Sequence, residues 1–178
     1  MKLFVTGPPG IGKTTLLARV ADRLKAAGVR VGGFITLEVR EVARRIGFDV
    51  LDLMTGARAP LARVGGDEPR VGRYALKKEG LLLARKALTS ALKEADVILL
   101  DEIGPMELKD EPLAAAIETA LESKKPLVAS VHAKSAHPLA AAARKTAIWL
   151  NEENRDALVN ELSKKVLEVV RGSAKEDL

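Results

Sequence analysis

The sequence feature that most limits what this chain can fold into is an eight-residue segment near its start, Gly7-Pro8-Pro9-Gly10-Ile11-Gly12-Lys13-Thr14. The segment matches the pattern G-x-x-x-x-G-K-[ST], in which the glycines let successive backbone N–H groups point at phosphate oxygens. A short apolar run, residues 2–6, precedes it, and apolar residues recur at helical spacing from Lys13 to Ala27. The sequence therefore predicts a phosphate-binding loop between a buried strand and a helix, whose positive dipole end adds to the attraction for an anion.

Each fixed position of this loop has an expected role. Lys13 places a compact positive charge near the β- and γ-phosphates, and the Thr14 hydroxyl takes a coordination position on Mg²⁺. The Thr15 hydroxyl is placed to donate to the α-phosphate. We therefore expect nucleotide contacts from all of the following residues: Gly7, Pro8, Pro9, Gly10, Ile11, Gly12, Lys13, Thr14 and Thr15.

Two acids, Asp101 and Glu102, directly follow the apolar run Val97–Leu100. Acids at the end of a buried strand are costly unless they face a cation or solvent. We predict that Asp101 holds Mg²⁺ together with Thr14, and that Glu102 is the general base that polarises water beside the γ-phosphate. The alternative is a pair of exposed loop acids. A carboxylate beside the Mg²⁺-binding Asp favours hydrolysis over transfer to a bound acceptor, so Lys13 and Glu102 are the predicted catalytic residues.

Arginines and one histidine are further candidates. A positive side chain near the γ-phosphate can stabilise the charge that develops in the transition state. The candidates are Arg40, Arg44, Arg45 and Arg73. The alternative is that they are surface residues, because arginines in a loop are more often solvated. His132 closes the apolar run Leu127–Val131, at the strand end where α/β sheets bind ligands. It is either a γ-phosphate sensor or a rim histidine bonded to the backbone. His137 is predicted to be structural, and a His132–His137 metal site lacks a third ligand.

The order of predicted elements indicates one α/β domain over residues 1–178. Strands that alternate with helices favour a mainly parallel sheet with helices on both faces. We expect strands at 2–6, 31–37, 97–100, 127–131 and 147–150, and helices at 13–27, 76–95, 111–123, 139–144 and 153–171, followed by a frayed tail from Gly172. Residues 38–74 are Arg-rich and broken by Gly and Pro, so they predict a small β-rich insertion with hairpin-like strands near 47–53 and 62–64. Trp149, on the last strand, is expected in the core rather than as a platform for a nucleotide base.

Composition excludes several classes of protein. The chain has no cysteine, which rules out disulfides, a thiol nucleophile and Cys-ligated metals, and fits the cytoplasm. It has no apolar run near 18 residues, so no membrane span is expected. Residues 1–30 hold six Lys and Arg against one acid, and this difference equals the whole net charge of +5. With aromatics at only 3%, we expect small anions rather than nucleic acid as partners, and we expect a monomer.

Several segments resemble a known family, the small P-loop nucleoside triphosphatases of archaea and hyperthermophilic bacteria whose human member is called cancer-related nucleoside triphosphatase. The likeness runs in matching order through most of the chain. It is specific in Arg44-Arg-Ile-Gly-Phe-Asp-Val50 and Asp101-Glu-Ile-Gly-Pro-Met-Glu-Leu108, and it continues through residues 34–41, 130–139 and 153–156.

The resemblance implies a RecA-like P-loop core that hydrolyses ATP, GTP, CTP and UTP to the diphosphate and phosphate, slowly, with Mg²⁺ and little base preference. It also implies nucleotide contacts from the second segment: Val97, Ile98, Leu99, Leu100, Asp101, Glu102, Ile103 and Gly104. The chain departs from the family pattern at Pro105, where a Lys is usual, and at Val42-Ala43, where Gly-Gly is common. Two other functions remain open, a small-molecule or nucleoside kinase on the same loop and an RNA-associated nucleotide switch.

Overall fold

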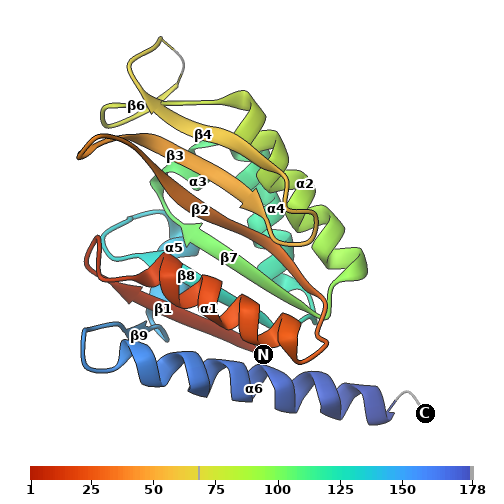
Figure 1. The fold of residues 1–178 in the computed structure, drawn as a ribbon. Helices are drawn as coiled ribbons and strands as arrows, with labels where there is room; N and C mark the ends of the chain where they lie inside the picture. Colours follow the sequence, from red (N-terminus) through yellow and green to blue (C-terminus); the bar gives the residue numbers. More distant parts are fainter. Residues whose placement is uncertain (68, 177–178) are drawn as a thin grey trace.

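The computed structural model describes residues 1–67 and 69–176 of the chain (Figure 1). Its strands are β1 (Lys2–Gly7), β2 (Val31–Glu41), β3 (Arg44–Asp52), β4 (Arg58–Val64), β5 (Arg70–Val71), β6 (Tyr74–Leu76), β7 (Val97–Ile103), β8 (Leu127–His132) and β9 (Ile148–Trp149). Its helices are α1 (Lys13–Ala26), α2 (Lys78–Glu94), α3 (Pro105–Lys109), α4 (Glu111–Glu122), α5 (Pro138–Arg144) and α6 (Arg155–Glu176).

The strands form a single mixed sheet in the order β5-β6-β4-β3-β2-β7-β8-β1-β9. The pairs from β2 through β7, β8 and β1 to β9 are parallel, whereas those from β2 through β3, β4 and β6 to β5 are antiparallel. The antiparallel half is segment 38–74, whose strands β3 and β4 match the hairpin-like strands predicted there. These strands continue the main sheet from the edge of β2, so the sheet as a whole is mixed rather than mainly parallel.

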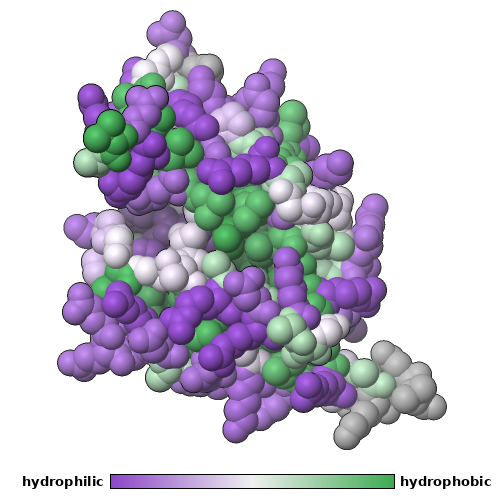
Figure 2. All heavy atoms as spheres, in the orientation of Figure 1, coloured by the Kyte–Doolittle hydropathy of each residue, from purple (hydrophilic) through white to green (hydrophobic). Residues whose placement is uncertain are grey.

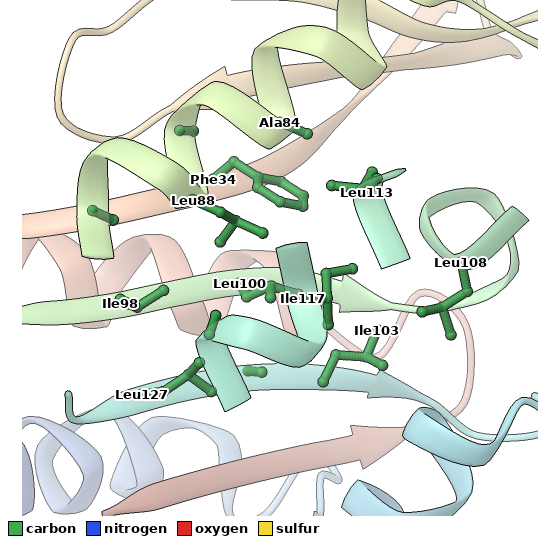
Figure 3. Packing of buried hydrophobic residues seen from close by; sticks show 14 of the residues in the cluster. Phe34, Ala84, Leu88, Ile98, Leu100, Ile103, Leu108, Leu113, Ile117 and Leu127 are labelled. Atoms are coloured by element: carbon green, nitrogen blue, oxygen red, sulfur yellow. The ribbon is translucent and has the colours of Figure 1, made fainter. Parts of the chain in front are cut away.

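Helices cover both faces of the sheet, as predicted. Buried side chains of α1 and α6 pack on one face and those of α2, α4 and α5 on the other, so each face has its own apolar core. Figure 3 shows the core on the α2 face, in which Phe34 of β2 packs beside Ala84 and Leu88 of α2. The small side chains of α2 let it approach closely, since a Cβ added at Gly32 of β2 would come within 2.5 Å of the Ala91 Cβ.

Three local predictions differ from the structure. β7 continues through Asp101 and Glu102 to Ile103, so both acids belong to the strand. The short helix α3, which begins at Pro105 where a proline needs no N–H partner, was not predicted. The tail expected to fray from Gly172 is helical to Glu176, because α6 meets no breaker stronger than Gly172, which costs only about 1 kcal/mol in a helix.

Trp149 is not in the core, and that prediction was wrong. Its neighbours Ile148 and Leu150 pack with α1 and α6, so Trp149 points to the opposite side of the two-residue edge strand β9 and is 56% exposed. Among the described residues, no helix is long and apolar enough to cross a membrane.

Candidate nucleotide site

The predicted phosphate loop joins the end of β1 at Gly7 to the start of α1 at Lys13. Gly10 and Gly12 have φ of +79° and +109°, a left-handed conformation that favours glycine because it has no Cβ. The Ile11 N–H donates to the Pro8 carbonyl at 3.3 Å, which closes a turn within the loop. Because β1, β7 and β8 are parallel, their carboxyl ends lie along the same sheet edge as this loop.

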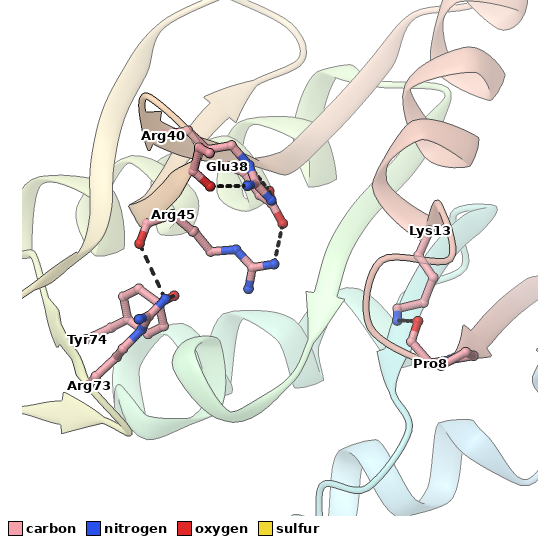
Figure 4. Close-up of polar contacts among 8 residues, drawn as sticks. Pro8, Lys13, Glu38, Arg40, Arg45, Arg73 and Tyr74 are labelled. Carbon is pink, nitrogen blue, oxygen red and sulfur yellow. Dashed lines mark hydrogen bonds and ion pairs between the residues drawn. The ribbon is translucent and has the colours of Figure 1, made fainter.

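Lys13 supplies the positive charge of the loop. Its Nζ donates to the carbonyls of Gly7 at 2.9 Å and Pro8 at 3.2 Å, so the ammonium lies over the loop (Figure 4). The first turn of α1 contains no acid that would offset the positive end of the helix dipole. The charge and the helix terminus therefore reinforce each other at one point, as a phosphate site requires.

Asp101 is buried, with 2% of its surface exposed, and is held by three hydroxyl groups. Its Oδ2 accepts from Thr14 Oγ1 at 2.7 Å and from Thr36 Oγ1 at 3.0 Å, and its Oδ1 accepts from Ser130 Oγ at 2.5 Å. The Thr36 N–H also donates to Oδ2 at 3.2 Å. The structure thus brings the two predicted metal ligands, Thr14 and Asp101, into contact.

Sequence reasoning missed Thr36 and Ser130. They lie on β2 and β8, the two strands that flank β7, and each is a polar residue near the carboxyl end of an otherwise apolar run. That pattern was a usable signal, but only once the strand order is known. The donor set fits Mg²⁺, which prefers oxygen ligands and is usually bound through one or two carboxylates together with substrate phosphates.

Glu102 follows on the same strand and lines the site cavity. Burial, and then the charge of the neighbouring Asp101 carboxylate, raise its pKa to about 7, and the charge of Lys13 opposes this shift. A carboxyl group with a pKa near neutrality is suited to accept a proton at physiological pH.

Glu107, on α3, is a second acid beside Glu102 that sequence reasoning did not single out. It is only 4% exposed, and burial, followed by the charge of Glu102, raises its pKa well above the ordinary value. Its only signal in the sequence was its place in the segment Asp101–Leu108 that carries the family resemblance. A neutral Glu107 leaves the negative charge of this pair on Glu102.

His132 lines the cavity at the end of β8, so the structure places it where it was predicted. Its Nδ1 accepts from the Lys134 N–H at 3.2 Å, as the rim alternative requires. Burial and then the charge of Lys13 lower its pKa. His137 is structural, since its Nδ1 accepts from the Leu139 N–H at the start of α5. In the part of the chain that the structure describes, no three His, Cys, Asp or Glu are arranged to hold a metal by themselves.

The candidate arginines separate into two groups. Arg40 and Arg45 line the cavity, and both pair with Glu38, at 2.9 and 2.8 Å. Arg44 is exposed and does not line the cavity. Arg73 donates to the Tyr74 hydroxyl at 3.0 Å and to the Arg45 carbonyl at 3.3 Å, also outside the cavity lining.

Part of the second predicted contact segment does not reach the cavity. Val97, Ile98, Leu99, Leu100 and Ile103 have no exposed surface, because β7 is the central strand between the two cores. These five residues therefore cannot contact a nucleotide, and that expectation was wrong. They hold Asp101 and Glu102 at the cavity wall.

The cavity has a volume of about 720 Å³ and extends from the phosphate loop to the antiparallel strands. In Figure 2 the surface is hollowed between the region of the phosphate loop and the tips of β2 and β3. Gly10, Gly12, Lys13, Thr14 and Thr15 line one side, and Asp101, Glu102 and His132 line its floor.

Residues 2–163 match the profile of a protein family described as NTPase. The chain belongs to this NTPase family. It is 43% identical over 171 residues to "Nucleoside-triphosphatase THEP1" of Pyrococcus abyssi, covering 96% of this chain and 94% of that protein. The protein of the same name from Methanocaldococcus jannaschii is 39% identical, covering 94% and 98% of the two chains.

Two solved structures have the same fold as this family member. The crystal structure of THEP1 from the hyperthermophile Aquifex aeolicus has a TM-score of 0.80 and 31% identity, covering 91% of this chain and 96% of that one. The solution structure of a human cancer-related nucleoside triphosphatase has a TM-score of 0.73 and 36% identity, covering 93% and 96%. The α/β P-loop fold and the resemblance inferred from the sequence are confirmed.

Proposed function

We propose that this protein hydrolyses nucleoside triphosphates to the diphosphate and phosphate in the cavity beside the phosphate loop. The observation that carries the proposal is the contact of Thr14 with Asp101, next to Glu102 and Lys13, because it gathers a metal site, a base and a cation at the end of one loop. The names of the relatives, which are nucleoside-triphosphatases, support the same activity.

We assign the binding of Mg²⁺ to Thr14 and Asp101. When bound there with the nucleotide, Mg²⁺ neutralises charge on the phosphate oxygens. Thr36 and Ser130 orient the Asp101 carboxylate, so that it keeps its position without a protein cation beside it. The loop N–H groups and Lys13 hold the β- and γ-phosphates, as the sequence pattern predicts.

Glu102 acts as the general base in this proposal. It accepts a proton from a water that attacks the γ-phosphorus, the bond to the bridging oxygen breaks, and the diphosphate leaves. Glu107, whose pKa burial raises, adds no further negative charge beside this base when it is protonated. Arg45 and His132, which line the same cavity, are candidates for stabilising the charge on the γ-phosphoryl oxygens.

Broad base tolerance also belongs to the proposal. The loop contacts phosphates rather than the base, and a tenfold discrimination between bases requires about 1.4 kcal/mol of specific contacts. The test is steady-state turnover of ATP, GTP, CTP and UTP, each with Mg²⁺ and with a chelator. We expect four rates within about tenfold of one another that are abolished by the chelator. Turnover of one nucleotide a hundredfold faster than the others would contradict broad base tolerance. Turnover without a divalent ion would contradict the metal site.

Action as a monomer in the cytoplasm remains a prediction from the sequence. The excess of positive charge near the phosphate loop still favours small anions over nucleic acid as partners. Salt-dependent binding of RNA would support the nucleotide-switch alternative instead.

A further inference from the structure

The cavity continues past the residues that a triphosphate and Mg²⁺ require. Beyond Glu102 it is lined by residues of the antiparallel strands and α3, which we call the outer compartment: Leu37, Glu38, Arg40, Arg45, Phe48, Leu61, Val71, Tyr74 and Met106. None of these residues belongs to the phosphate loop, and apart from Arg45 none has a role in the proposed hydrolysis.

One end of the outer compartment is aromatic. The rings of Phe48 and Tyr74 meet edge to face, with centroids 5.3 Å apart and an interplanar angle of 65°. They belong to a small apolar cluster, separate from the two cores of the sheet, in which Phe48, Val71 and Met106 remain partly exposed. Partly exposed apolar and aromatic side chains that line a cavity are a suitable surface for a planar ring.

Positive charge lies directly beside these rings. Arg40 and Arg45 share the single carboxylate of Glu38, which leaves one positive charge uncompensated within this group. The Arg45 guanidinium lies 5.4 Å from the centre of the Phe48 ring. In Figure 4 the guanidinium projects from β3 between Glu38 and the pair Arg73–Tyr74. A net positive charge beside an aromatic wall favours an anionic group attached to a ring.

The position of the compartment indicates the role of such a ligand. A triphosphate bound in the loop has its γ-phosphate at Asp101 and Glu102 and its α-phosphate at Thr15. The sugar and base are attached at the α-phosphate end. Figure 4 shows Arg45 and Glu38 of this compartment on the side of the cavity opposite Lys13. We infer that the compartment lies beyond the γ-phosphate, on the side away from the base. A ligand there would face the γ-phosphorus from the direction in which water attacks.

We propose that the outer compartment binds a nucleoside monophosphate, with the base against Phe48 and Tyr74 and the phosphate at Arg45, and that the γ-phosphoryl group is transferred to it in competition with water. The inference rests on the proposed binding of Mg²⁺–NTP at the loop. A phosphate oxygen of the monophosphate attacks the γ-phosphorus, and the bond from that phosphorus to the β–γ bridging oxygen breaks. Two nucleoside diphosphates result, and no proton, oxidant or reductant is needed.

The two reactions differ in their need for Glu102. Water must lose a proton to become an effective nucleophile, whereas the monophosphate attacks with an oxygen that is already ionised near neutral pH. Glu102→Gln should therefore reduce hydrolysis by about 10² to 10⁴ and leave transfer within about tenfold of the original protein.

The experiment uses the full chain, GTP labelled at the γ position as donor and CMP as acceptor, with UMP and AMP as further probes. Labelled CDP reports transfer and labelled phosphate reports hydrolysis in the same reaction. Lys13→Ala, purified in the same way, shows how much labelled CDP comes from contaminating kinases. Phe48→Leu removes the stacking ring, so the ratio of transfer to hydrolysis at limiting CMP should fall about tenfold. Leu82→Ala, an exposed apolar change on α2 outside the cavity lining, should keep the ratio.

The outcomes separate this inference from the proposed function. Labelled CDP that depends on Lys13 and falls in Phe48→Leu supports the compartment as an acceptor site. Normal hydrolysis with only labelled phosphate, at millimolar concentrations of all three monophosphates, overturns it and leaves the hydrolase intact. Transfer that is unaffected by Phe48→Leu also overturns it, because the acceptor then binds elsewhere. If Phe48→Leu does not fold, Val71→Glu places a negative charge at the same wall on a two-residue edge strand and should lower the ratio in the same way.

Discussion

Lys13 is the side chain on which the phosphate site depends most directly. Lys13→Ala removes the cation and preserves α1, because alanine is the best helix former. We expect turnover to fall by about a hundredfold or more, the range for losing one strong electrostatic contact to the transition state, with the melting temperature nearly unchanged. Turnover is measured by phosphate release and folding by thermal unfolding. Full activity in this variant would show that the loop does not hold the substrate.

Asp101 and Glu102 are adjacent but have different surroundings, so Asp101→Asn and Glu102→Gln should impair different steps. Asp101→Asn loses the charge that attracts Mg²⁺ and also disturbs the bonds from Thr14, Thr36 and Ser130, so Mg²⁺-dependent nucleotide binding should weaken. Glu102→Gln keeps those contacts, so it should bind Mg²⁺–nucleotide with near-normal affinity while hydrolysis falls by about 10² to 10⁴. Nucleotide affinity and single-turnover rates of both variants check this. Normal hydrolysis by Glu102→Gln would remove Glu102 from the mechanism.

Residue roles were predictable from sequence where a local pattern fixes them. Lys13, Thr14 and Asp101 each occupy a position in a short motif, and the structure brings Thr14 and Asp101 together. Thr36, Ser130 and Glu107 could not be assigned in this way, because their partners come from other strands or depend on burial. The same limit applies to the five core residues of β7 that were expected to contact nucleotide. The family resemblance indicated the whole segment, but it could not show which of its side chains the sheet buries.

At the scale of elements, the helices and parallel strands were predicted well because their apolar spacing is regular. In segment 38–74 the hairpin-like strands predicted near 47–53 and 62–64 are present within β3 and β4. However, β3 begins three residues earlier, at Arg44, and β4 four residues earlier, at Arg58, because charges and glycines mask the alternation there. Phe48, Val50 and Asp52 alternate with Asp49 and Leu51, yet both faces carry buried residues, because the Val50 side meets α2 and the cavity whereas Leu51 packs at the edge of the α1 core. Strands that are buried on both faces without a continuous apolar run have ends that are hard to place from sequence.

The contact between α2 and β2 gives a test at this scale. A Cβ at Gly32 would meet the Ala91 Cβ at 2.5 Å and the Ala95 Cβ at 2.9 Å, so Gly32→Ala should force α2 away from the sheet. The expected loss of stability is about 1–3 kcal/mol. Gly172→Ala is the matched control, because nothing lies within 4 Å of its added Cβ on α6, and it should gain up to about 1 kcal/mol. Chemical unfolding of both variants measures this, and equal effects would mean that the close approach of α2 is not a constraint.

At the scale of the whole molecule, the two halves of the mixed sheet form opposite walls of one cavity. The parallel half carries the phosphate loop and the acids at the ends of β1 and β7, and the antiparallel half supplies the far wall of the same cavity. Because β2 belongs to both halves, Thr36 holds Asp101 while Glu38 holds Arg45 only two residues further along. The sequence indicated both halves separately, but not that a single strand connects them.

The stability of the whole molecule should depend on pH through its buried carboxyls. The pKa values of Glu102 and Glu107 are raised in the folded state, so the folded protein holds protons that the unfolded chain releases above its ordinary pKa of 4.5. Their contribution to stability is therefore complete below about pH 4.5 and is lost as pH rises through the folded pKa, which for Glu102 is about 7. The opposite sign holds for Asp49. Its pKa is lowered by its hydrogen bonds to Arg63 and Arg58, against the effect of burial, so its contribution is lost in acid, below 3.8.

In the absence of nucleotide, the melting temperature should accordingly be highest in mildly acidic solution and fall between pH 5 and pH 8. Glu107→Gln tests the cause, because the amide oxygen can still accept the backbone N–H bonds of Glu107 and Glu102 but the side chain cannot ionise. In Glu107→Gln the melting temperature should fall less between pH 5 and pH 8, and at pH 8 it should be at least that of the original protein. Glu107→Lys, which buries a cation at the same place, should have a lower melting temperature at every pH. Thermal unfolding of the three proteins across that pH range is the measurement. An unchanged slope in Glu107→Gln would mean that Glu107 is not the protonated partner of Glu102.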